Sequence, residues 1–458
     1  MSESTSSKSW LLEHHTTPFS LSNLPLGIAS HPSLSLSPGP ATRLGDHVLF
    51  LQPLLQGGAF SKFVSFDHGH HDAFSATTLN LFAALGRSYH RDFRRYIQDL
   101  LRQGTPHREL LEDNAALQSK AIAPADECRM HLPMQIGDYT DFYVGLNHAY
   151  NVGSLFRGPQ NALQPNYTHL PVGYHGRAST VKVSGTPVRR PWGQFLHHPG
   201  ASEPTFAPSR KLDVEVEFAA FVCKPNTPGS DQADEGSSSE AKPIPVGEAS
   251  EHIFGYVLMN DWSARDVQAW EYVPLGPFNS KNFSTTISPW IVLPDALEPH
   301  RRQTTIVLPE GVKRTTLPYL QESDDGIGSH FDVRIQMTLQ PSGSSLAVIA
   351  QTNSSHLLFS FPQMLAHHTI TGCAMNVGDL IASGTISGPT TNEMGSLLEM
   401  TENGKNPITV GPDHVERRFL EDGDEVVITG TAGREGSFVG FGDCRGIILP
   451  AIKNPLGK

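Results

Sequence analysis

The sequence predicts a mainly β protein with some α-helix, divided into two domains. Its 458 residues are more than one ordinary hydrophobic core accommodates. The 41 glycines and 35 prolines indicate frequent turns between short strands. A third observation is a segment at residues 211–218 in which apolar and acidic side chains alternate strictly, as they do along a β-strand.

Composition narrows the range of partners. Charged residues make up 17% of the chain and the net charge is −12, which argues against binding to nucleic acid, because neutralising phosphates requires clustered Lys and Arg. No apolar run approaches the roughly 20 residues that span a bilayer, so we expect no membrane association. The N-terminus has no apolar signal segment, and the four cysteines lack CxxC spacing. A cytoplasmic location is therefore expected.

Residues 1–16 are polar and predict a flexible tail. Short apolar runs broken by Pro and Gly between residues 28 and 55 indicate a small β-unit. Residues 77–101 predict one amphipathic helix, whose aromatic residues we assign to the core rather than to a cofactor. The residues at helical spacing are Leu79, Phe82, Leu85, Tyr89, Phe93, Tyr96, Ile97 and Leu100.

Residues 224–244 are small, polar and acidic. Strand patterns resume on both sides of this segment. It is therefore interpreted as a disordered surface loop inserted within the second domain, not as a linker between domains.

The alternating segment 211–218 carries the first chemical signal. Leu212, Val214, Val216 and Phe218 would enter a core, while the opposite face carries Asp213, Glu215 and Glu217. Neighbouring carboxylates on that face would lie roughly 6–7 Å apart. Two like charges at that distance repel by about 2–3 kcal/mol at an effective dielectric near 20. Either the face is solvated, or a positive group offsets the repulsion.

Other polar residues cluster in two further segments. Residues 137–148 hold Asp141, Tyr143 and His148, and an apolar strand at 254–259 leads to Asp261. After it, three polar side chains at i, i+3 and i+7 share one helical face, which suits a polar ligand better than a core. They are Arg265, Gln268 and Tyr272. The alternative interpretation makes Asp261 a helix N-cap with Arg265 as its charge partner.

Four carboxylates could form one metal site. Asp141, Glu215, Glu217 and Asp261 offer only oxygen ligands, which favour Mg²⁺ or Ca²⁺ over zinc. The sequence alone does not prove that the four converge. Lys281 lies among small residues, and a lone lysine of this kind is usually just solvated.

Several longer motifs closely resemble the fumarylacetoacetase family, and the resemblance runs from about residue 20 to residue 451. The motifs are Met-His-Leu-Pro at 130–133, Ile-Gly-Asp-Tyr-Thr-Asp-Phe-Tyr at 136–143, Leu-Pro-Val-Gly-Tyr-His-Gly-Arg-Ala-Ser at 170–179, Met-Asn-Asp-Trp-Ser-Ala-Arg-Asp at 259–266, Trp-Glu-Tyr-Val-Pro-Leu-Gly-Pro-Phe at 270–278 and Ala-Ser-Gly-Thr-Ile-Ser-Gly at 382–388.

The resemblance implies a fold and an activity. It implies a small SH3-like N-terminal β-barrel domain with a helix at residues 17–133 and a larger mixed β-roll catalytic domain at 134–458. The implied protein is a metal-dependent homodimer that takes a small-molecule substrate. The implied reaction hydrolyses a carbon–carbon bond of 4-fumarylacetoacetate to fumarate and acetoacetate, the final step of tyrosine and phenylalanine catabolism.

The resemblance also implies roles for individual residues. The metal carboxylates match Asp141, Glu215, Glu217 and Asp261, with Lys281 and Thr285 close to the metal. His148 matches the family's general base, and Glu399 matches the residue that orients it. We add Arg265, Gln268 and Lys281 as catalytic hydrogen-bond donors to the oxyanion that forms in the reaction. Substrate contacts match Tyr143, Arg157, Tyr174, Gln268, Tyr272 and Thr385. The departures are Ser280 and Ser284, where the family usually has glycines around the lysine, and Val-Gly-Leu-Asn at 144–147, where a polar run is expected before His148.

Two other classes of protein remain open. The first is a related enzyme of the same superfamily, such as an acylpyruvate hydrolase, an isomerase, a decarboxylase or a paralogue acting on a related diketone acid. The second is a non-catalytic Ca²⁺-binding β-protein, in which the carboxylates only brace loops. The second class would leave His148, Arg265 and Gln268 without a purpose.

Overall fold

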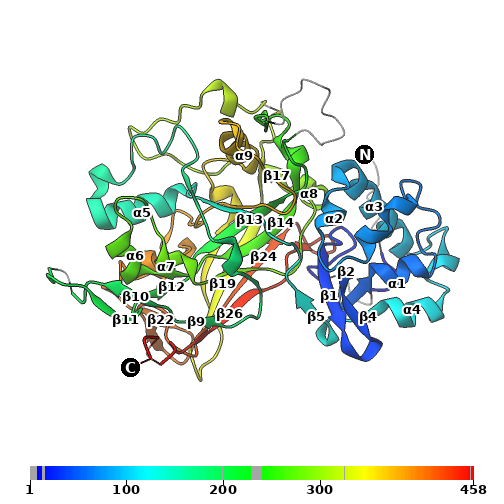
Figure 1. Cartoon of the computed structure of the whole chain (residues 1–458), viewed down its shortest axis with the longest axis horizontal. Helices are drawn as coiled ribbons and strands as arrows, with labels where there is room; N and C mark the ends of the chain where they lie inside the picture. The colour runs from blue at the N-terminus through cyan, green and yellow to red at the C-terminus, as the bar shows by residue number, and fades with distance from the viewer. Residues whose placement is uncertain are drawn as a thin grey trace.

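Two bodies of secondary structure lie side by side in the chain (Figure 1). The structure is a computed structural model and describes residues 8–12, 16–198, 200–227, 240–323, 325–453 and 455–457. The smaller body contains the first strands of the chain and the helices that follow them, and the larger body contains most of the strands. The chain is mainly β with some helix, as the sequence predicts. Within these described residues, no helix is long and apolar enough to cross a membrane.

The smaller body is built on a five-stranded antiparallel sheet in the order β4-β3-β2-β1-β5. Its strands are β1 Leu26–His31, β2 Leu36–Leu44, β3 His47–Phe50, β4 Ile122–Pro124 and β5 Arg129–His131. The SH3-like character of this sheet stays a prediction.

The single helix predicted at 77–101 is two helices, α2 Asn80–Ala83 and α3 Gly86–Leu101. The break falls between Ala83 and Gly86, the first residue of α3, whose φ of 84° lies in the left-handed region that a continuous helix could not pass through. The predicted core role of the aromatic residues is confirmed, since Phe82, Tyr89 and Phe93 are buried together.

Part of the predicted tail is held against α3. Ser9 Oγ donates to the Leu101 carbonyl at 2.7 Å, and Trp10 Nε1 donates to the Leu100 carbonyl at 3.0 Å. Residues 1–7 and 13–15, also predicted to belong to the tail, lie outside the described residues.

The larger body contains two main sheets. One has seven strands in the order β7-β6-β21-β13-β14-β16-β8. The other has six, of which five follow the order β20-β19-β24-β26-β9 and the sixth, β25, pairs with β24 beside this path. The seven strands are β6 Tyr139–Phe142, β7 Gly173–His175, β8 Val181–Val183, β13 Val216–Val222, β14 Ile253–Asn260, β16 Thr285–Ile287 and β21 Leu380–Ala382. The six are β9 Val188–Arg189, β19 Val333–Gln340, β20 Ala347–Asn353, β24 Glu425–Ala432 and β26 Cys444–Leu449, with β25 Val439–Gly440 pairing β24 as a side strand.

The remaining elements are short. The helices are α1 Leu51–Gln56, α4 Ala115–Ala121, α5 Leu146–Arg157, α6 Arg265–Glu271, α7 Asn279–Asn282, α8 Pro294–Leu297, α9 Phe361–Thr369 and α10 Leu397–Met400. The strands are β10 Trp192–Phe195, β11 Thr205–Pro208, β12 Leu212–Asp213, β15 Ser263–Ala264, β17 Arg301–Arg302, β18 His330–Phe331, β22 Ile408–Val410 and β23 Val415–Arg417.

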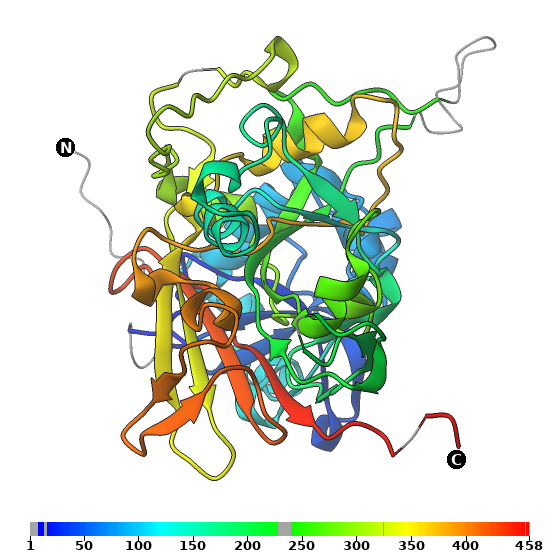
Figure 2. The same cartoon turned by 90° about the vertical axis from the view of Figure 1, so that its left-hand side faces the viewer.

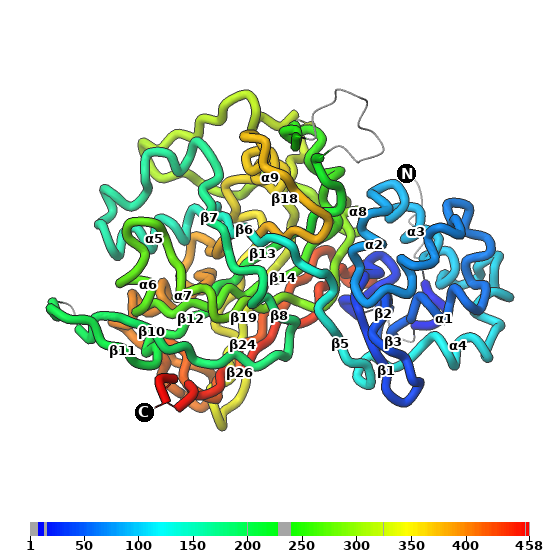
Figure 3. The backbone as a smooth tube through the Cα atoms, viewed as in Figure 1, coloured from blue at the N-terminus to red at the C-terminus, as the bar shows by residue number. Residues whose placement is uncertain are grey.

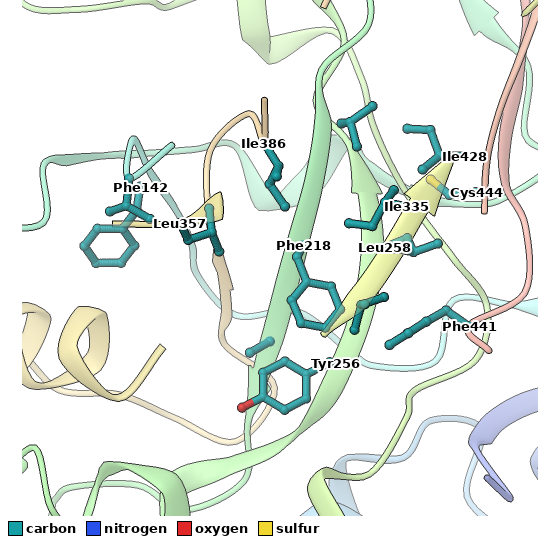
Figure 4. Close-up of a cluster of buried hydrophobic side chains, with 14 of the residues drawn as sticks. Phe142, Phe218, Tyr256, Leu258, Ile335, Leu357, Ile386, Ile428, Phe441 and Cys444 are labelled. Carbon is teal, nitrogen blue, oxygen red and sulfur yellow. The ribbon is translucent and has the colours of Figure 1, made fainter. Parts of the chain in front are cut away.

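The two sheets share one hydrophobic core. Figure 2 shows the yellow and red strands of the six-stranded sheet beside the green strands of the other. Phe218 and Leu258 from the seven-stranded sheet pack with Ile335 and Ile428 from the six-stranded sheet (Figure 4). Residues of both sheets are fully buried there, so this core fixes the position of β13 and β14, which lead into the site.

The predicted alternation at 211–218 is confirmed for the core face, although the strand is interrupted. Leu212 lies in β12, which pairs with β15, and the ladder between β13 and β14 begins at Val216. Each of the three acidic side chains that alternate with the core residues is at most 5% exposed. The alternative of a solvated acidic face is therefore wrong, and positive groups must offset these charges inside the protein.

The predicted loop at 224–244 leaves the larger body after β13. The described parts of it, 224–227 and 240–244, form neither helix nor strand, and residues 228–239 lie outside the described residues.

Ion pairs connect the two bodies. Asp295 of α8 accepts from Arg87 at 3.1 Å and from Arg91 at 2.7 Å, both on α3.

Candidate active site

Three carboxylates from separate strands meet at one end of the seven-stranded sheet. Asp141 is on β6, Glu217 is on β13, and Asp261 directly follows β14. One oxygen from each lies within 4.8 Å of the others, and all three side chains are buried. The predicted convergence of distant carboxylates is found for these three.

The donor set fits a divalent cation. Asp141 Oδ1 and both carboxylate oxygens of Glu217 are buried and have no hydrogen-bond partner among the described residues. Burial, and then repulsion from the neighbouring carboxylates, raises the pKa of Asp141 and of Glu217 well above the usual values. An oxygen-only set with free lone pairs is what a hard cation such as Mg²⁺ or Ca²⁺ uses.

The fourth predicted ligand, Glu215, is held differently. Its Oε1 lies 2.7 Å from Arg265 Nη2, and its Oε2 contacts Lys281 Nζ. Burial opposes ionisation of Glu215, but Lys281 and Arg265 outweigh that effect and lower its pKa to about 2. Glu215 is thus ion-paired beside the three convergent carboxylates, and its role as a metal ligand stays a prediction.

Lys281 and Thr285 both contact Asp261. Lys281 Nζ lies 2.6 Å from Asp261 Oδ2, and Thr285 Oγ1 donates to Asp261 Oδ1 at 2.9 Å. Although burial opposes the charge, Asp261 and Glu215 raise the pKa of Lys281. An ammonium has no lone pair for a metal, so Lys281 neutralises carboxylates and does not act as a ligand in this state.

His148 and Glu399 form a buried pair on two short helices, α5 and α10. His148 Nδ1 lies 2.6 Å from Glu399 Oε2. The carboxylate also accepts from Asn151 Nδ2 at 2.9 Å, Ser387 Oγ at 2.9 Å and Ser396 Oγ at 2.7 Å. Burial favours a protonated Glu399, but His148 and these donors prevail and lower its pKa. Glu399 is therefore an anion that fixes the His148 ring.

The predicted polar stripe on α6 lies on one wall of a cavity. Arg265, Gln268 and Tyr272 all line it. Arg265 Nη1 donates to Gln268 Oε1 at 3.0 Å. The alternative in which Asp261 caps this helix is wrong, because the N-cap is Ala264, and the partners of Arg265 are Asp213 and Glu215.

The cavity measures about 430 Å³ and collects most of the predicted residues. Helices α5, α6 and α7 lie beside it, at the end of the larger body away from the smaller one (Figure 3). Predicted residues that line it are Asp141, Tyr143, His148, Arg157, Tyr174, Glu215, Glu217, Arg265, Gln268, Tyr272, Lys281 and Thr385. Asp261, Thr285 and Glu399 are buried but do not line it. Asp261 and Glu399 each contact a residue that does, and Thr285 contacts Asp261.

Four residues of the site act through other side chains, a role that was not predicted for them from the sequence. Asn151, Ser387 and Ser396 hold Glu399, and Asp213 holds Arg265. Two of them left a signal in the sequence. Asn151 lies three residues after His148 and so on the same helical face, and Asp213 alternates with Glu215 and Glu217 on the acidic strand face. Gln164 and Phe156, which line the cavity, carried no signal of this kind.

The fold and the cavity define a mainly β protein with a buried carboxylate cluster beside a His–Glu pair. Residues 139–446 match the family model described as fumarylacetoacetate hydrolase C-terminal, and residues 22–133 match the one described as fumarylacetoacetase N-terminal. The chain belongs to the fumarylacetoacetate hydrolase family.

Relatives match over nearly the whole length. The chain is 56% identical to the fumarylacetoacetase fahA of Aspergillus fumigatus, over 97% of this chain and 99% of that protein. It is 44% identical to the fumarylacetoacetase of Oryza sativa, over 95% of each. It is also 44% identical to that of Rattus norvegicus, over 95% and 97%. Among solved structures, a fumarylacetoacetate hydrolase from Exiguobacterium antarcticum aligns over 93% of this chain and 99% of its own, with a TM-score of 0.48 and 15% identity.

Proposed function

We propose that this protein hydrolyses the carbon–carbon bond of 4-fumarylacetoacetate to give fumarate and acetoacetate, in tyrosine and phenylalanine catabolism. Relatives named fumarylacetoacetase, up to 56% identical over nearly the full chain, support this proposal. The structural observation that carries it is the His148–Glu399 pair opening into the same cavity as the carboxylate cluster and Arg265.

His148 activates water in the proposed reaction. Glu399 accepts from Nδ1 and thereby leaves Nε2 free to take a proton from water. The anionic Glu399 also stabilises the imidazolium as it forms. Base catalysis by a positioned imidazole contributes roughly 10²–10⁴-fold to the rate.

Cations that line the same cavity stabilise the negative charge that water attack creates on the substrate carbonyl. Arg265 and Lys281 are positively charged and line the cavity, and Gln268 offers an amide donor. Losing one such donor typically costs on the order of 10²–10³-fold in kcat. Tyr143, Arg157, Tyr174, Tyr272 and Thr385 are proposed as substrate contacts on the same cavity lining.

Asp141, Glu217 and Asp261, with Glu215 beside them, would hold the divalent cation. When bound, the cation supplies Lewis acidity toward the oxygens of the leaving acetoacetate group. Mg²⁺ and Ca²⁺ differ in preferred coordination number and oxygen distance, so titration with each ion decides between them.

The proposal extends to organisation. We assign catalysis to residues 134–458 and an accessory role to the N-terminal domain at 17–133, with the protein acting as a cytoplasmic homodimer. The position of the cavity supports the assignment of catalysis, since all of its lining residues lie after residue 140. Sedimentation of the purified protein measures the oligomeric state directly.

The decisive test is the loss of ultraviolet absorbance of fumarylacetoacetate on adding purified protein. Turnover should stop with EDTA, return with Mg²⁺ or Ca²⁺, and release fumarate and acetoacetate in equal amounts. An inert protein under saturating metal would reject the proposed activity. A non-catalytic Ca²⁺-binding protein would instead show only a fall in melting temperature after chelation.

A further inference from the structure

Asp213 is a buried carboxylate that bonds both to Arg265 and to the first turn of α10. It is completely buried and accepts four hydrogen bonds. Oδ1 accepts from the backbone N–H of Val214 at 2.8 Å and of Leu397 at 2.8 Å. Oδ2 accepts from Arg265 Nε at 2.8 Å and from the backbone N–H of Leu398 at 3.0 Å. Each oxygen therefore serves two donors.

One branch of this hydrogen-bond network leads to Arg265. With Nε fixed by Asp213, the Arg265 guanidinium reaches Gln268 Oε1 through Nη1, at 3.0 Å, and Glu215 Oε1 through Nη2, at 2.7 Å. Two hydrogen bonds, from Nε and Nη1, and the ion pair at Nη2 restrict the rotation of the planar guanidinium. Asp213 thus sets the orientation of Arg265.

The other branch leads to the base. Leu397 and Leu398 form the first turn of α10, whose backbone N–H groups have no partner within the helix. Asp213 accepts from both of them. The next residue is Glu399, which lies 2.6 Å from His148 Nδ1. The carboxylate of Asp213 thereby fixes the turn that presents Glu399 to His148.

We propose that Asp213 is a positioning residue that holds the His148–Glu399 pair and Arg265 at one fixed spacing. It touches neither substrate nor metal and acts through Arg265 and α10. The proposal rests on the proposed hydrolysis, because the spacing matters only if the base that activates water must lie at a set distance from the group that stabilises the resulting charge. A misplacement of about 1 Å in such a pair can cost roughly 10²-fold in rate.

Asp213→Asn is the direct test because it keeps the size of the side chain. One oxygen becomes an amide NH₂, a donor that faces donors. Since each Asp213 oxygen accepts from one N–H of the α10 turn, either orientation of the amide removes an acceptor from α10. We expect kcat to fall roughly 10²-fold, with KM and cation affinity changed by less than about threefold.

Asp424→Asn is the matched control. Asp424 is likewise completely buried and accepts from Arg417 Nε at 2.8 Å and from the backbone N–H of Glu421 at 2.8 Å and of Ser342 at 3.1 Å. It does not line the cavity. This variant should lose thermal stability to a similar extent while kcat stays within about twofold of wild type. An equal loss of kcat in both variants would make the effect a general one of stability and overturn the proposal.

A double-mutant cycle with Glu399→Gln tests the route of action. If Asp213 acts partly by placing Glu399, Asp213→Asn should cost at least about tenfold less in the Glu399→Gln background than in wild type. Equal costs in both backgrounds overturn that route.

If Asp213→Asn does not fold, Leu397→Pro replaces it. Proline is tolerated at the first helical position and removes the backbone N–H, and Leu397→Ala is the control for loss of the leucine side chain. Leu397→Pro should then have the lower kcat of the two, and equal values would overturn the proposal.

A crystal structure of Asp213→Asn supplies a readout that does not depend on turnover. We expect the first turn of α10, with Glu399, to move relative to Arg265. Coordinates in which both side chains superimpose on wild type overturn the proposal. A wild-type protein inert toward fumarylacetoacetate would reject the hydrolysis, while the crystallographic comparison would still decide whether Asp213 positions these groups.

Discussion

His148 Nδ1 lies 2.6 Å from Glu399 Oε2, although 251 residues separate the two in the chain. Glu399 accepts from three further side chains, two of them serine hydroxyls. A buried carboxylate with this many donors stays ionised and immobile. The geometry assigns Nδ1–H to the Glu399 bond and leaves the other ring nitrogen for proton transfer.

Glu399→Gln should lower kcat by roughly 10²–10⁴-fold, because a neutral amide can also donate to Nδ1 and hold His148 in the wrong tautomer. Cation affinity should not change, since Glu399 lies outside the carboxylate cluster. Steady-state kinetics together with Mg²⁺ and Ca²⁺ titration measure both. Ser396→Ala removes one of the several donors to Glu399 and should cost less. Wild-type kcat in Glu399→Gln would exclude this role.

Glu217→Gln should strongly reduce the rise in melting temperature that Mg²⁺ or Ca²⁺ produces in wild type, because it replaces a carboxylate, whose two oxygens have no other partner among the described residues, with a neutral amide that has one oxygen. Without metal, the same variant should melt at or above the wild-type temperature, since the neutral amide, like a protonated Glu217, does not repel the neighbouring carboxylates. Scanning calorimetry with and without EDTA measures both effects. Glu416→Gln, at an exposed position, is the control and should behave as wild type. An unchanged metal response in Glu217→Gln would remove this residue from the site.

Asp295→Asn should destabilise the protein by about 1.5–3 kcal/mol at neutral pH, the usual contribution of hydrogen bonds to charged groups. Burial opposes the charge of Asp295, but Arg91 and Arg87 prevail and lower its pKa. A lowered pKa in the folded state gives stability that is present above the unfolded value near 4 and is lost as pH falls through the folded value.

The difference between wild type and Asp295→Asn should therefore be constant from pH 6 to 8 and shrink below about pH 4. Urea unfolding at a series of pH values measures it. Asp99→Asn, which breaks a half-exposed pair with Arg102, should cost at most about 1 kcal/mol. A difference for Asp295→Asn that grows toward acid pH would contradict the assignment.

Gly145→Ala should lower kcat while the protein still folds. Gly145 is the N-cap of α5, which carries His148, and a β-carbon there would overlap the Thr385 carbonyl oxygen. The start of α5 must then move away from Thr385, and we expect kcat to fall roughly 10²-fold. Gly39→Ala is the control, because a β-carbon at that position meets only the Ser37 carbonyl oxygen, at 3.8 Å. Unchanged kinetics in Gly145→Ala would show that α5 tolerates the shift.

Part of the site could be predicted from local pattern. The alternation at 211–218 predicted which side chains enter the core, and helical spacing predicted that Arg265, Gln268 and Tyr272 share a face. Local pattern could not separate the acidic residues of one strand face. Asp213, Glu215 and Glu217 alternate identically, yet each has a different set of partners. Those partners come from distant segments, so nothing within the strand distinguishes the three.

Local sequence pattern was sufficient to predict the β-rich class, the core face of each amphipathic segment and the residue types of the site, because side-chain periodicity follows from local backbone geometry. Tertiary structure determined which charges meet. It broke the predicted helix at Gly86, where the backbone turns into the left-handed region. It brought Asp141, Glu217 and Asp261 together and directed Glu215 toward Lys281 and Arg265. The physical reason is that ionisation of a buried group depends on neighbours supplied by sheet pairing and packing between distant parts of the chain.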